Sequence, residues 1–570
     1  MTYFDRYEIR NGTTYVYRKK PDSSEEIEYE LCEDIRVVSR KKVMYEKNNP
    51  IVVDVLINNE PNAKPIVGIP RSTIVKSPID FFADYGLNIS NLNEYNVTLG
   101  EVLQDTEKSV PIQREYDKLG YIISNKKLYF AASSIYPENH TLCLKKGTAT
   151  KSKGTFESWR EELLPYIEDN EYLQLALAIS ASAPTLKLLQ YYNIIHESMM
   201  FSYIGESSSG KTLALSLGAS IYGKPTISDG IIDTMIDTEN YFFSQLSVKN
   251  GVAHFVDEAT LETRMDFTKK IYQVSMQHER GRLNGDGTPK EARTWVSTVI
   301  FTGERSILDM TNGNAGLTAR MIEFYHKWTH DGDSADSIYK IINSNYGTAW
   351  LPLVQGLTEL KKSGLICIYN NNLNYLKAQV ASGEGIGNRI LSKFAVILAT
   401  IDVLQEAWQI KFDKEKILQI LIEKHNDVVK SDIVFETYDK LLSHIVQNGK
   451  LFPKPYKANG CCDDIFLSGN KHGIISTYNN RKCIWMIKDK FEEFIKTVPN
   501  VNLKMIRKSF KERGYIAYFD ESYLRQQQVD TAKVSCYCIF LDSNDRPVKA
   551  NPSKKKRKNQ YKHLIADDDE

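Results

Sequence analysis

The segment from Met199 to Ser216 changes from an apolar run to a polar loop bracketed by glycines, and then to a helical pattern. The loop follows the pattern Gly-x-x-x-x-Gly-Lys-Thr between a predicted strand and a predicted helix, the context that a phosphate-binding loop requires. Inward-facing backbone N–H groups and the positive end of the next helix would bind a polyphosphate. A Gly-Ser turn that caps an ordinary helix remains the alternative. The predicted phosphate-contacting positions are Gly205, Glu206, Ser207, Ser208, Ser209, Gly210, Lys211 and Thr212.

An acidic pair, Asp257-Glu258, ends the next apolar run, VAHFVD. Acidic pairs at strand ends are common, but after a phosphate-binding loop this order predicts ATP hydrolysis with Mg²⁺. Lys211 would reach the β and γ phosphates. Thr212 and Asp257 would hold Mg²⁺, while Glu258 would polarise the attacking water.

Three short apolar runs are the elements expected to position these side chains: MMFSYI, VAHFVD and TWVSTVIFT. Such runs, rich in β-branched residues and separated by helical patterns, predict a parallel sheet buried on both faces. Functional residues of such sheets lie at the carboxyl edge. Thr212, Asp257 and Thr302 should therefore lie close together.

The chain has 570 residues, of which 42% are hydrophobic and 25% charged. At about 150 residues per domain, this length favours three or four globular domains. The N-terminal residues MTYFDRYEIR are charged, and no apolar stretch reaches the roughly 18 residues of a membrane span. We therefore expect a cytoplasmic protein without a membrane partner. Eight scattered cysteines without CxxC spacing favour buried thiols, with a C-terminal zinc site as the alternative.

Positive charge is concentrated near the C-terminus. Residues 471–563 contain 21 Lys and Arg against 9 Asp and Glu, whereas the last seven residues, LIADDDE, are acidic. A local excess of this kind is typical of a segment that binds nucleic acid, although a solvated charged face gives the same pattern. The run KKKRK at 554–558 predicts a disordered tail.

Five ordered motifs carry a family resemblance: GTFESWREELLPYIEDN, GESSSGKT, FVDEAT, FTGERS and GLTARMIEF. They resemble the AAA+ ATPase family of mobile genetic elements long labelled a domain of unknown function, in particular the Cch-type helicases of staphylococcal cassette chromosomes, which are similar to MCM helicases. The resemblance runs from about residue 154 to residue 540. It implies a ring, a homohexamer, that hydrolyses ATP between subunits and moves on single-stranded DNA.

The resemblance also assigns roles to individual residues. Thr302 matches the sensor of the γ phosphate or the attacking water. Arg320 resembles the arginine finger that enters the neighbouring site, and Arg389 resembles the second sensor. Arginine suits both tasks because it stays charged and presents a planar fork of donors. Surface salt bridges are the alternative for both, and Arg305 is the competing finger candidate.

A basic hairpin is predicted between the second motif and the sensor strand. The sequence HERGRLNGDGTPKEARTW contains NGDG, a strong tight-turn signal between two strand-compatible flanks. It resembles the hairpin that MCM-like and superfamily-3 helicases insert into a ring channel, although it lacks the Gly- and Lys-rich run expected of the family. An ordinary surface hairpin is the alternative. The predicted DNA contacts are Arg280, Arg282, Lys290 and Arg293.

These patterns predict a multidomain α/β protein. A helical segment is expected from Trp159 through Tyr192, interrupted near Pro165 and Pro184, and a helix–turn–helix pattern before a strand pair predicts a winged helix. The predicted parts are a β-rich domain (1–150), a helical lead-in (151–198), the AAA+ P-loop ATPase core (199–330), a helical lid (331–425), a winged helix (426–548) and a charged tail (549–570).

Two functions fit these parts. The first is an ATP-dependent helicase or translocase on single-stranded or forked DNA, supporting replication of a bacterial mobile element together with other replication proteins. The second is an AAA+ loader or assembly factor that binds DNA through the winged helix without unwinding. A motor requires positive charge inside the ring, so the basic hairpin distinguishes the two. No NKxD motif of guanine recognition is present, which disfavours a GTPase.

Overall fold

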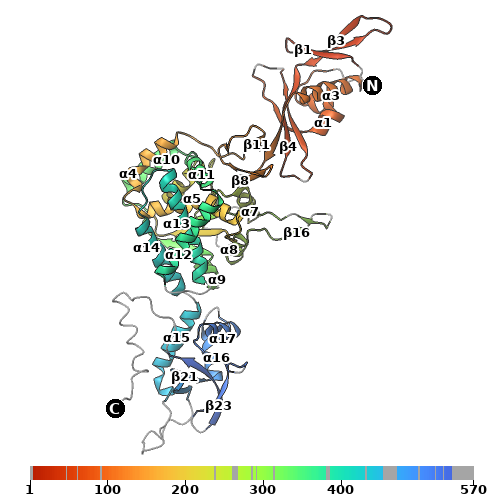
Figure 1. Cartoon of the computed structure of the whole chain (residues 1–570). Coiled ribbons are helices and arrows are strands. Elements are labelled where there is room, and N and C mark those ends of the chain that lie inside the picture. Colours follow the sequence, from red (N-terminus) through yellow and green to blue (C-terminus); the bar gives the residue numbers. More distant parts are fainter. Residues whose placement is uncertain are drawn as a thin grey trace, which may run out of the picture.

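The structure is a computed structural model, and its elements fall into an N-terminal, a central and a C-terminal part along the chain (Figure 1). The residues that it describes are 4–46, 48–58, 60, 62–89, 93–235, 239–259, 267–283, 285, 287–290, 292–311, 315–380, 386–430, 433–453, 471–498, 501–519, 521–529 and 532–541. The predicted tail at 549–570 lies outside them, as do Cys461 and Cys462.

The N-terminal part is rich in strands, as predicted, but also contains three helices that the sequence patterns did not indicate. The helices cover a sheet of order β11-β7-β4-β5-β6 and bury Ile74, Phe82 and Leu99 against it. The elements are β1 (Arg6–Arg10), β2 (Thr13–Lys19), β3 (Glu26–Glu33), β4 (Ile35–Val43), β5 (Ile51–Ile57), β6 (Ile66–Pro70), α1 (Arg71–Lys76), α2 (Pro78–Ala83), α3 (Asn93–Lys108), β7 (Ile112–Tyr116), β8 (Leu119–Ser124), β9 (Lys127–Ala131), β10 (Ile135–Tyr136) and β11 (Leu142–Leu144).

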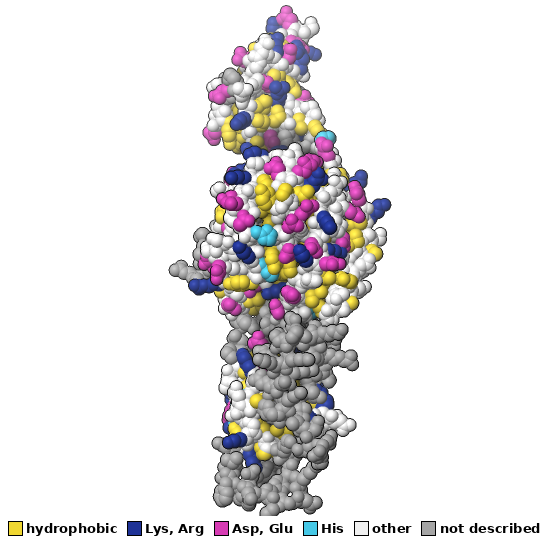
Figure 2. All heavy atoms as spheres, turned by 90° about the vertical axis from the view of Figure 1, so that its left-hand side faces the viewer, with side chains coloured by type: hydrophobic (Ala, Val, Ile, Leu, Met, Phe, Trp, Pro, Cys, Tyr) yellow, Lys and Arg dark blue, Asp and Glu magenta, His cyan; other side chains and the backbone are white. Residues whose placement is uncertain are grey.

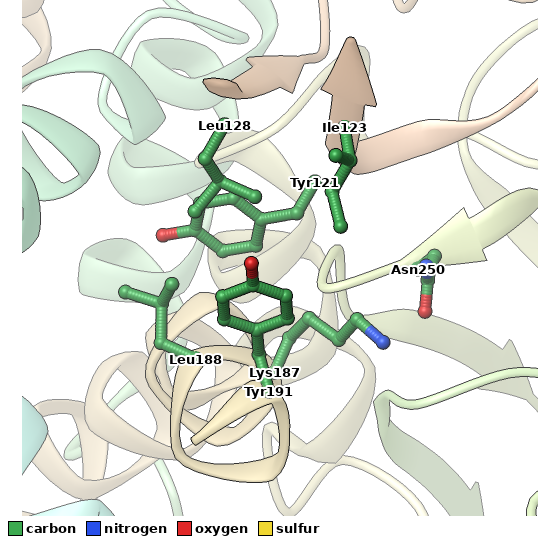
Figure 3. Close-up of a pocket in the computed structure, with 7 residues that line it drawn as sticks. All are labelled: Tyr121, Ile123, Leu128, Lys187, Leu188, Tyr191 and Asn250. Carbon is green, nitrogen blue, oxygen red and sulfur yellow. The ribbon is translucent and has the colours of Figure 1, made fainter. Parts of the chain in front are cut away.

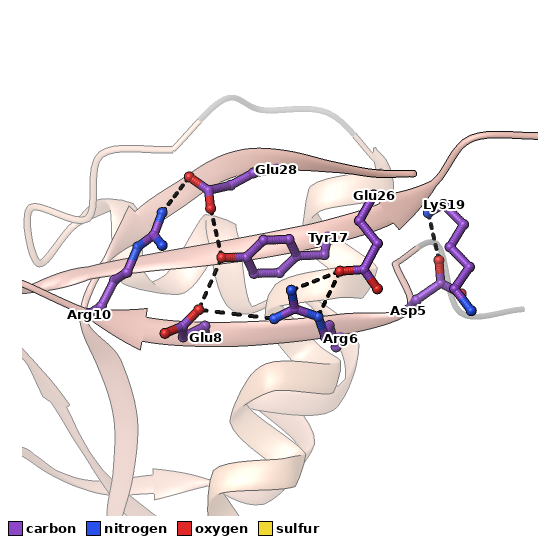
Figure 4. Close-up of polar contacts among 8 residues, drawn as sticks. All are labelled: Asp5, Arg6, Glu8, Arg10, Tyr17, Lys19, Glu26 and Glu28. Carbon is purple, nitrogen blue, oxygen red and sulfur yellow. Dashed lines mark hydrogen bonds and ion pairs between the residues drawn. The ribbon is translucent and has the colours of Figure 1, made fainter. Parts of the chain in front are cut away.

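The sheet β1-β2-β3 is held by cross-strand polar contacts on one face (Figure 4). Arg6 pairs with Glu26 at 2.8 Å, and the Tyr17 hydroxyl donates to Glu28 at 2.7 Å and to Glu8 at 3.1 Å. Arg6 lies on β1 and Glu26 on β3, so this ion pair reaches across the middle strand β2 and joins all three strands. The charge-rich sequence of this sheet is thus accounted for by its own pairing.

The central part is built on a five-stranded parallel sheet of order β13-β15-β18-β12-β19, which confirms the predicted parallel sheet. The sheet order is not the chain order, because β18 lies between β12 and β15. The elements of this region are β12 (Met199–Ile204), α6 (Lys211–Ser220), β13 (Ile232–Thr234), α7 (Glu239–Val248), β14 (Lys249–Asn250), β15 (His254–Asp257), α8 (Phe267–Met276), β16 (Arg282–Leu283), β17 (Pro289–Lys290), β18 (Thr298–Gly303), η2 (Leu308–Met310), α9 (Ala315–Thr318) and β19 (Met321–Tyr325).

Both faces of this sheet are buried. Successive side chains of a strand point to opposite faces, so Phe201 of β12 packs in the cluster that contains α5 (Glu171–Tyr191) and α6, whereas Met200 packs with α7 and α8. All six residues of β12 and all six of β18 are buried. This double burial explains why the strands are continuous apolar runs rather than alternating ones.

Helices before and after the sheet share one hydrophobic core with it. Trp159 and Trp408, more than two hundred residues apart, pack edge to face at 5.1 Å. The most apolar window of α5 has the length and composition of a membrane span, but 89% of it is buried inside the protein. The helices are α4 (Phe156–Ile167), α5 (Glu171–Tyr191), α10 (Gly332–Ser344), α11 (Trp350–Glu359), α12 (Lys361–Gln379), α13 (Ile386–Ala407) and α14 (Lys414–Lys430).

The break between α4 and α5 was predicted at the wrong residues. Pro165 and Pro184 lie inside α4 and α5, and the break instead precedes Asn170, whose side chain accepts hydrogen bonds from the N–H groups of Tyr172 and Leu173. Pro184 has no N–H for the carbonyl of Ser180, but the Tyr222 hydroxyl donates to that oxygen at 3.0 Å. A tertiary contact thus replaces the missing helical bond.

One strand links the N-terminal and central parts. β14 extends the sheet β10-β9-β8, with Lys249 paired to Leu119 and Asn250 to Gly120. Gly120 has a left-handed backbone (φ +85°), and a Cβ there would lie 1.9 Å from the Asn250 carbonyl oxygen. Only glycine allows this close approach.

The C-terminal part combines helices with a sheet of order β20-β21-β23-β22. Cys483, Cys536 and Cys538 are buried thiols on β21 and β23 that form no disulfide, and burial raises the pKa of Cys536 to about 11. Among the described residues, no cluster of three His, Cys, Asp or Glu could hold a metal. The elements are α15 (Ile433–Gln447), η3 (Gly449–Leu451), β20 (Gly473–Tyr478), β21 (Arg481–Ile487), α16 (Lys488–Thr497), α17 (Leu503–Glu512), β22 (Arg525–Val529) and β23 (Ala532–Phe540).

Tyr222→Phe should destabilise the central part by about 1–3 kcal/mol, because it leaves the buried Ser180 carbonyl without a donor. Urea unfolding followed by tryptophan fluorescence measures this, since Trp159, Trp295, Trp328, Trp350 and Trp408 all lie there. In a Pro184→Ala background the restored helical N–H should reduce the loss. An equal loss in both backgrounds would contradict the compensation.

Candidate functional site: the carboxyl edge of the central sheet

The predicted phosphate loop connects the end of β12 to the start of α6. Gly210 adopts a left-handed conformation (φ +82°) directly before the helix. Lys211 is 5% exposed, and its Nζ donates to the Glu206 carbonyl at 3.1 Å. The loop thus curves around the lysine, while Ser207 and Ser208 face solvent. This arrangement places the lysine at the first position of α6, where the N–H groups of the helix N-terminus favour an anion.

Trp328 and Thr329, which follow β19, contact the phosphate loop. The backbone N–H of Trp328 donates to the Ser209 carbonyl at 2.8 Å, and the Asn170 side chain donates to the Trp328 carbonyl at 2.9 Å. A Cβ on Gly210 would lie 2.8 Å from Oγ1 of Thr329 and 3.1 Å from its nitrogen. The loop therefore depends on contacts with Asn170, Trp328 and Thr329 that its own motif does not indicate.

Thr302 joins the two acidic residues of the neighbouring strand. Its hydroxyl donates to Asp257 Oδ1 and accepts from the backbone N–H of Glu258 at 3.0 Å. Thr302 is fully buried at the end of β18. Its only proton is directed to Asp257 in this structure, so the hydroxyl positions the acidic pair, and the predicted contact with the γ phosphate or the attacking water stays a prediction.

Glu258 is held in an uncommon backbone conformation. Its φ is +51°, a left-handed value that costs a non-glycine residue of order 1–3 kcal/mol. The hydrogen bond from its N–H to Thr302 helps to maintain that conformation. Burial and then the nearby Asp257 carboxylate raise the pKa of Glu258, against the smaller opposite effect of Lys211. A carboxyl group with a raised pKa accepts a proton more readily, which suits a general base.

The residues present fit a magnesium nucleotide. The Thr212 hydroxyl lies 3.3 Å from Asp257 Oδ1, so an alcohol and a carboxylate meet beside the loop. Mg²⁺ commonly takes one or two protein oxygens and completes its shell with waters and phosphate oxygens. The Ser209 hydroxyl is buried without a hydrogen-bond partner among the described residues. Buried polar groups are usually hydrogen-bonded, so this hydroxyl is available to a bound ligand.

Arg320 and Arg389 lie at the opposite edge of the sheet from the loop. Arg320 directly precedes β19, and Met321 pairs with Met200 at the start of β12. At about 3.3 Å per residue, the strands separate Arg320 from the loop by roughly 15 Å. Arg389 pairs with Glu197, which also precedes β12. Neither arginine reaches the loop of its own chain.

Glu197 and Lys393, which the sequence patterns did not indicate, form a charged cluster with Arg320 and Arg389. Lys393 Nζ donates to the Ala319 carbonyl at 2.6 Å and lies 3.7 Å from Glu197 Oε2. Burial lowers the pKa of Lys393 to about 8. The four-residue spacing of Arg389 and Lys393 puts both on one helix face, and this spacing was the available signal. Three cations thus surround one carboxylate.

Arg305 lies at the carboxyl edge of the sheet, on the same side as the phosphate loop. It follows the end of β18 by two residues and is exposed. The Glu323 carboxylate holds the following segment, accepting from Ser306 Oγ and from the Ile307 N–H, each at 2.7 Å. The finger candidates are therefore separated: Arg305 lies on the loop side and Arg320 on the opposite side.

The predicted basic hairpin is present as β16 and β17, which pair antiparallel with Arg282 opposite Lys290. It projects away from the central part in Figure 1. Arg280 is exposed, whereas Arg293 lies 3.9 Å from Glu279 on the facing side of the stem. The side chains of Arg282 and Lys290 lie outside the described residues. On the face drawn in Figure 2, charges of both signs are mixed over the described part, without a broad basic surface.

A cavity of about 180 Å³ lies where β8 and β9 meet α5, and it is separate from the loop (Figure 3). At about 1.5 Å per helical residue, Lys187 is roughly 25 Å along α5 from Asn170, which supports the loop. Burial and the charge of Lys118 lower the pKa of Lys187. The lining residues are Tyr121, Ile123, Leu128, Lys187, Leu188, Tyr191 and Asn250.

Comparisons with known proteins agree with this architecture. A family model described as a domain of unknown function, DUF927, matches residues 6–294. A solved structure described as SCCmec type IV Cch, an active helicase, has a TM-score of 0.71 at 19% identity, over 95% of this chain and 98% of that chain. The apo A form of the NrS-1 C-terminal region has a TM-score of only 0.31 at 11% identity, over 89% of this chain and 96% of that chain. No curated protein matches the sequence.

Gly210→Ala should distort the phosphate loop, because alanine is strained at φ +82° and its Cβ would collide with Thr329. We expect a loss of stability of about 1–3 kcal/mol and a larger loss of nucleotide affinity. Thermal unfolding with and without Mg-ATP measures both. Gly281→Ala is the matched control, since a Cβ at Gly281 meets no atom within 4 Å. Equal behaviour of the two variants would contradict the assignment.

Proposed function

Because the chain belongs to the DUF927 family and has the fold of a protein described as an active helicase, we propose that it hydrolyses ATP to move along single-stranded DNA and unwind forked duplexes. The observation that carries the proposal is the convergence of Lys211, Asp257, Glu258 and Thr302 at one sheet edge. The helicase is only 19% identical, so the comparison supports the fold, and the activity is inferred from these residues.

In the proposed reaction the phosphate loop binds the triphosphate through its backbone N–H groups. Lys211 stabilises the charge that develops on the β and γ phosphates, and Thr212 with Asp257 holds Mg²⁺. When bound, the metal ion neutralises phosphate charge and orients the substrate. Glu258 accepts a hydrogen bond from the attacking water and polarises it, and Thr302 fixes the direction of the Glu258 carboxylate through the backbone.

The opposite positions of the loop and the arginine cluster support a ring of identical subunits. One edge of each chain would present its phosphate loop, and the other edge would present Arg320 and Arg389 to the next chain's nucleotide. A closed homo-oligomer with head-to-tail contacts satisfies both edges of every subunit. We propose a hexamer, with Arg320 rather than Arg305 as the finger, because Arg305 lies on the loop side of its own chain.

DNA contact is assigned to the hairpin 282–290 in the ring channel and to the C-terminal part. α16, α17 and the β22–β23 hairpin support a winged helix, and Lys504, Lys508 and Lys511 of α17 are exposed. The basic tail would raise local DNA concentration. Replication of a mobile genetic element in the bacterial cytoplasm, with other replication proteins, is the role that fits these activities.

Glu258→Gln should retain ATP binding and lose about 100-fold or more in turnover, because it removes the water-polarising carboxylate without changing the loop. Lys211→Ala should weaken binding as well. Phosphate release and equilibrium binding of labelled ATP separate the two effects. Near-normal turnover in Glu258→Gln would reject the role of this carboxylate.

The pH profile is an independent check on Glu258. As the base it must be ionised, so activity is present above its pKa and is lost as the pH falls through that value. Burial and Asp257 raise the pKa above the ordinary 4.5, so the acid limb of kcat/KM, which reports ionisation in the free enzyme, should lie higher than for an unperturbed glutamate. A limb at the ordinary value would contradict the expected environment.

Arg282→Ala with Lys290→Ala should lower DNA-stimulated ATPase activity and unwinding of a forked duplex at saturating DNA. Each lost phosphate contact should also reduce the salt slope of single-strand binding by about 0.7. The matched control, Lys340→Ala with Lys377→Ala, removes the same charge from exposed helix positions of the central part. Wild-type unwinding by the hairpin variant would contradict the channel assignment.

The loader hypothesis makes the opposite prediction for the same assay. If correctly assembled wild-type protein hydrolyses ATP and binds DNA but unwinds no fork, its ATP hydrolysis is not coupled to strand separation. That outcome would favour an assembly factor.

A further inference from the structure

Arg320 is held by contacts inside its own chain that do not use its whole guanidinium. Its guanidinium lies over the Tyr272 ring, 4.6 Å from the centroid, and its Nη1 donates to the Gly316 carbonyl at 2.7 Å. Its Nε is buried and has no hydrogen-bond partner among the described residues. An arginine with an unused buried donor gains by exchanging these contacts for an anion that uses its whole fork.

Gly316 makes this contact possible. A Cβ at that position would lie 3.0 Å from Arg320 Nη1 and 3.6 Å from the Tyr272 hydroxyl. On the other side, Lys393 holds the carbonyls of Ala319 and Arg320. Hydrogen bonds from Lys393 therefore hold the backbone here, whereas the guanidinium is held by the tyrosine ring and by the Gly316 carbonyl.

Tyr272 belongs to the helix that carries the basic hairpin. The end of α8 is tied to the returning strand: Trp295 Nε1 donates to the Val274 carbonyl at 3.0 Å, and the Trp295 N–H donates to the Gln277 carbonyl at 3.1 Å. Further along the stem, the Glu279 N–H donates to the Arg293 carbonyl at 2.8 Å. One helical turn separates Tyr272 from this stem, so a shift of α8 moves the hairpin with it.

We propose that Tyr272 couples the engagement of Arg320 with a second copy's nucleotide to the position of the hairpin 282–290. The inference rests on the proposed function. In this scheme the Arg320 guanidinium leaves the Tyr272 ring to bind the phosphate of the neighbouring copy. Helix α8 then loses its contact with Arg320. The hairpin, which is attached to the end of α8, shifts to a second position. Tyr272 is a positioning residue in this scheme and touches neither nucleotide nor DNA.

The test compares Tyr272→Leu, which removes the ring, with Tyr272→Phe, which keeps it. The control is Met276→Ala, an exposed position on the same helix. Deuterium uptake of residues 277–295 is measured in the full chain with and without the ATP analogue AMP-PNP and Mg²⁺. The ratio of ATPase rates with and without single-stranded DNA is measured alongside.

The wild type, Tyr272→Phe and Met276→Ala should show a nucleotide-dependent change in hairpin exchange and full DNA stimulation. Tyr272→Leu should lose the exchange change, and its stimulation ratio should fall about 3- to 30-fold, the range of one cation–π contact. Adding Arg320→Ala should cause no further loss of coupling. Wild-type behaviour of Tyr272→Leu, or an equal defect in Tyr272→Phe, would overturn the proposal.

Two further experiments distinguish failure of this inference from failure of the proposed function. If Tyr272→Leu fails to fold, Gly316→Ala disturbs the same contact and should reproduce the coupling defect; normal coupling there overturns the proposal. A co-assembled mixture of Arg320→Ala and Lys211→Ala chains should regain ATPase activity, and no recovery would overturn the action of Arg320 in a second copy. Absence of DNA stimulation in the wild type would instead reject the proposed function itself.

Discussion

A single buried hydroxyl at the end of β18 organises the candidate site. Thr302 lies between the strand that leads to the phosphate loop and the strand that ends in the acidic pair. Because it bonds both Asp257 and the backbone of Glu258, it sets the direction of one carboxylate and the backbone conformation of the other. The sheet order that inserts β18 between β12 and β15 is thus the condition for the chemistry. The apolar packing of both sheet faces maintains that order.

The same parallel sheet separates the charges that the proposed reaction needs. Residues at the carboxyl ends of the strands can meet one another, but residues before the strands cannot reach them. Arg320, Arg389 and Lys393 gather at the far edge, where Glu197 offsets only part of their charge. Lys393 is buried and the two arginines are partly exposed, so the cluster carries excess positive charge that favours an approaching anion. A second copy that supplies phosphate would resolve this imbalance, so the electrostatics and the proposed assembly agree.

The sequence predicted local features of the site better than its long-range ones. The loop at 205–212 and the strand ending at Asp257 follow from residue patterns that act within one segment. The contact of Trp328 with the loop and the pairing of Glu197 with Arg389 join residues far apart in the chain, and no periodicity encodes them. Pro184 illustrates the same limit. It was expected to interrupt a helix, but Tyr222, thirty-eight positions later, donates to the carbonyl that the proline leaves free.

The short strand β14 bears on how the protein is made. The edge of β8 at Leu119 is covered only by pairing with Lys249, which is synthesised about 130 residues later. A ribosome that adds some 5–20 residues per second would leave that edge open for roughly 6 to 26 seconds. Open strand edges pair with other chains, so nascent copies synthesised side by side are at risk of misassembly during this interval. The close fit of Asn250 against Gly120 then makes completion of the N-terminal sheet a late event that requires the central part to have begun folding.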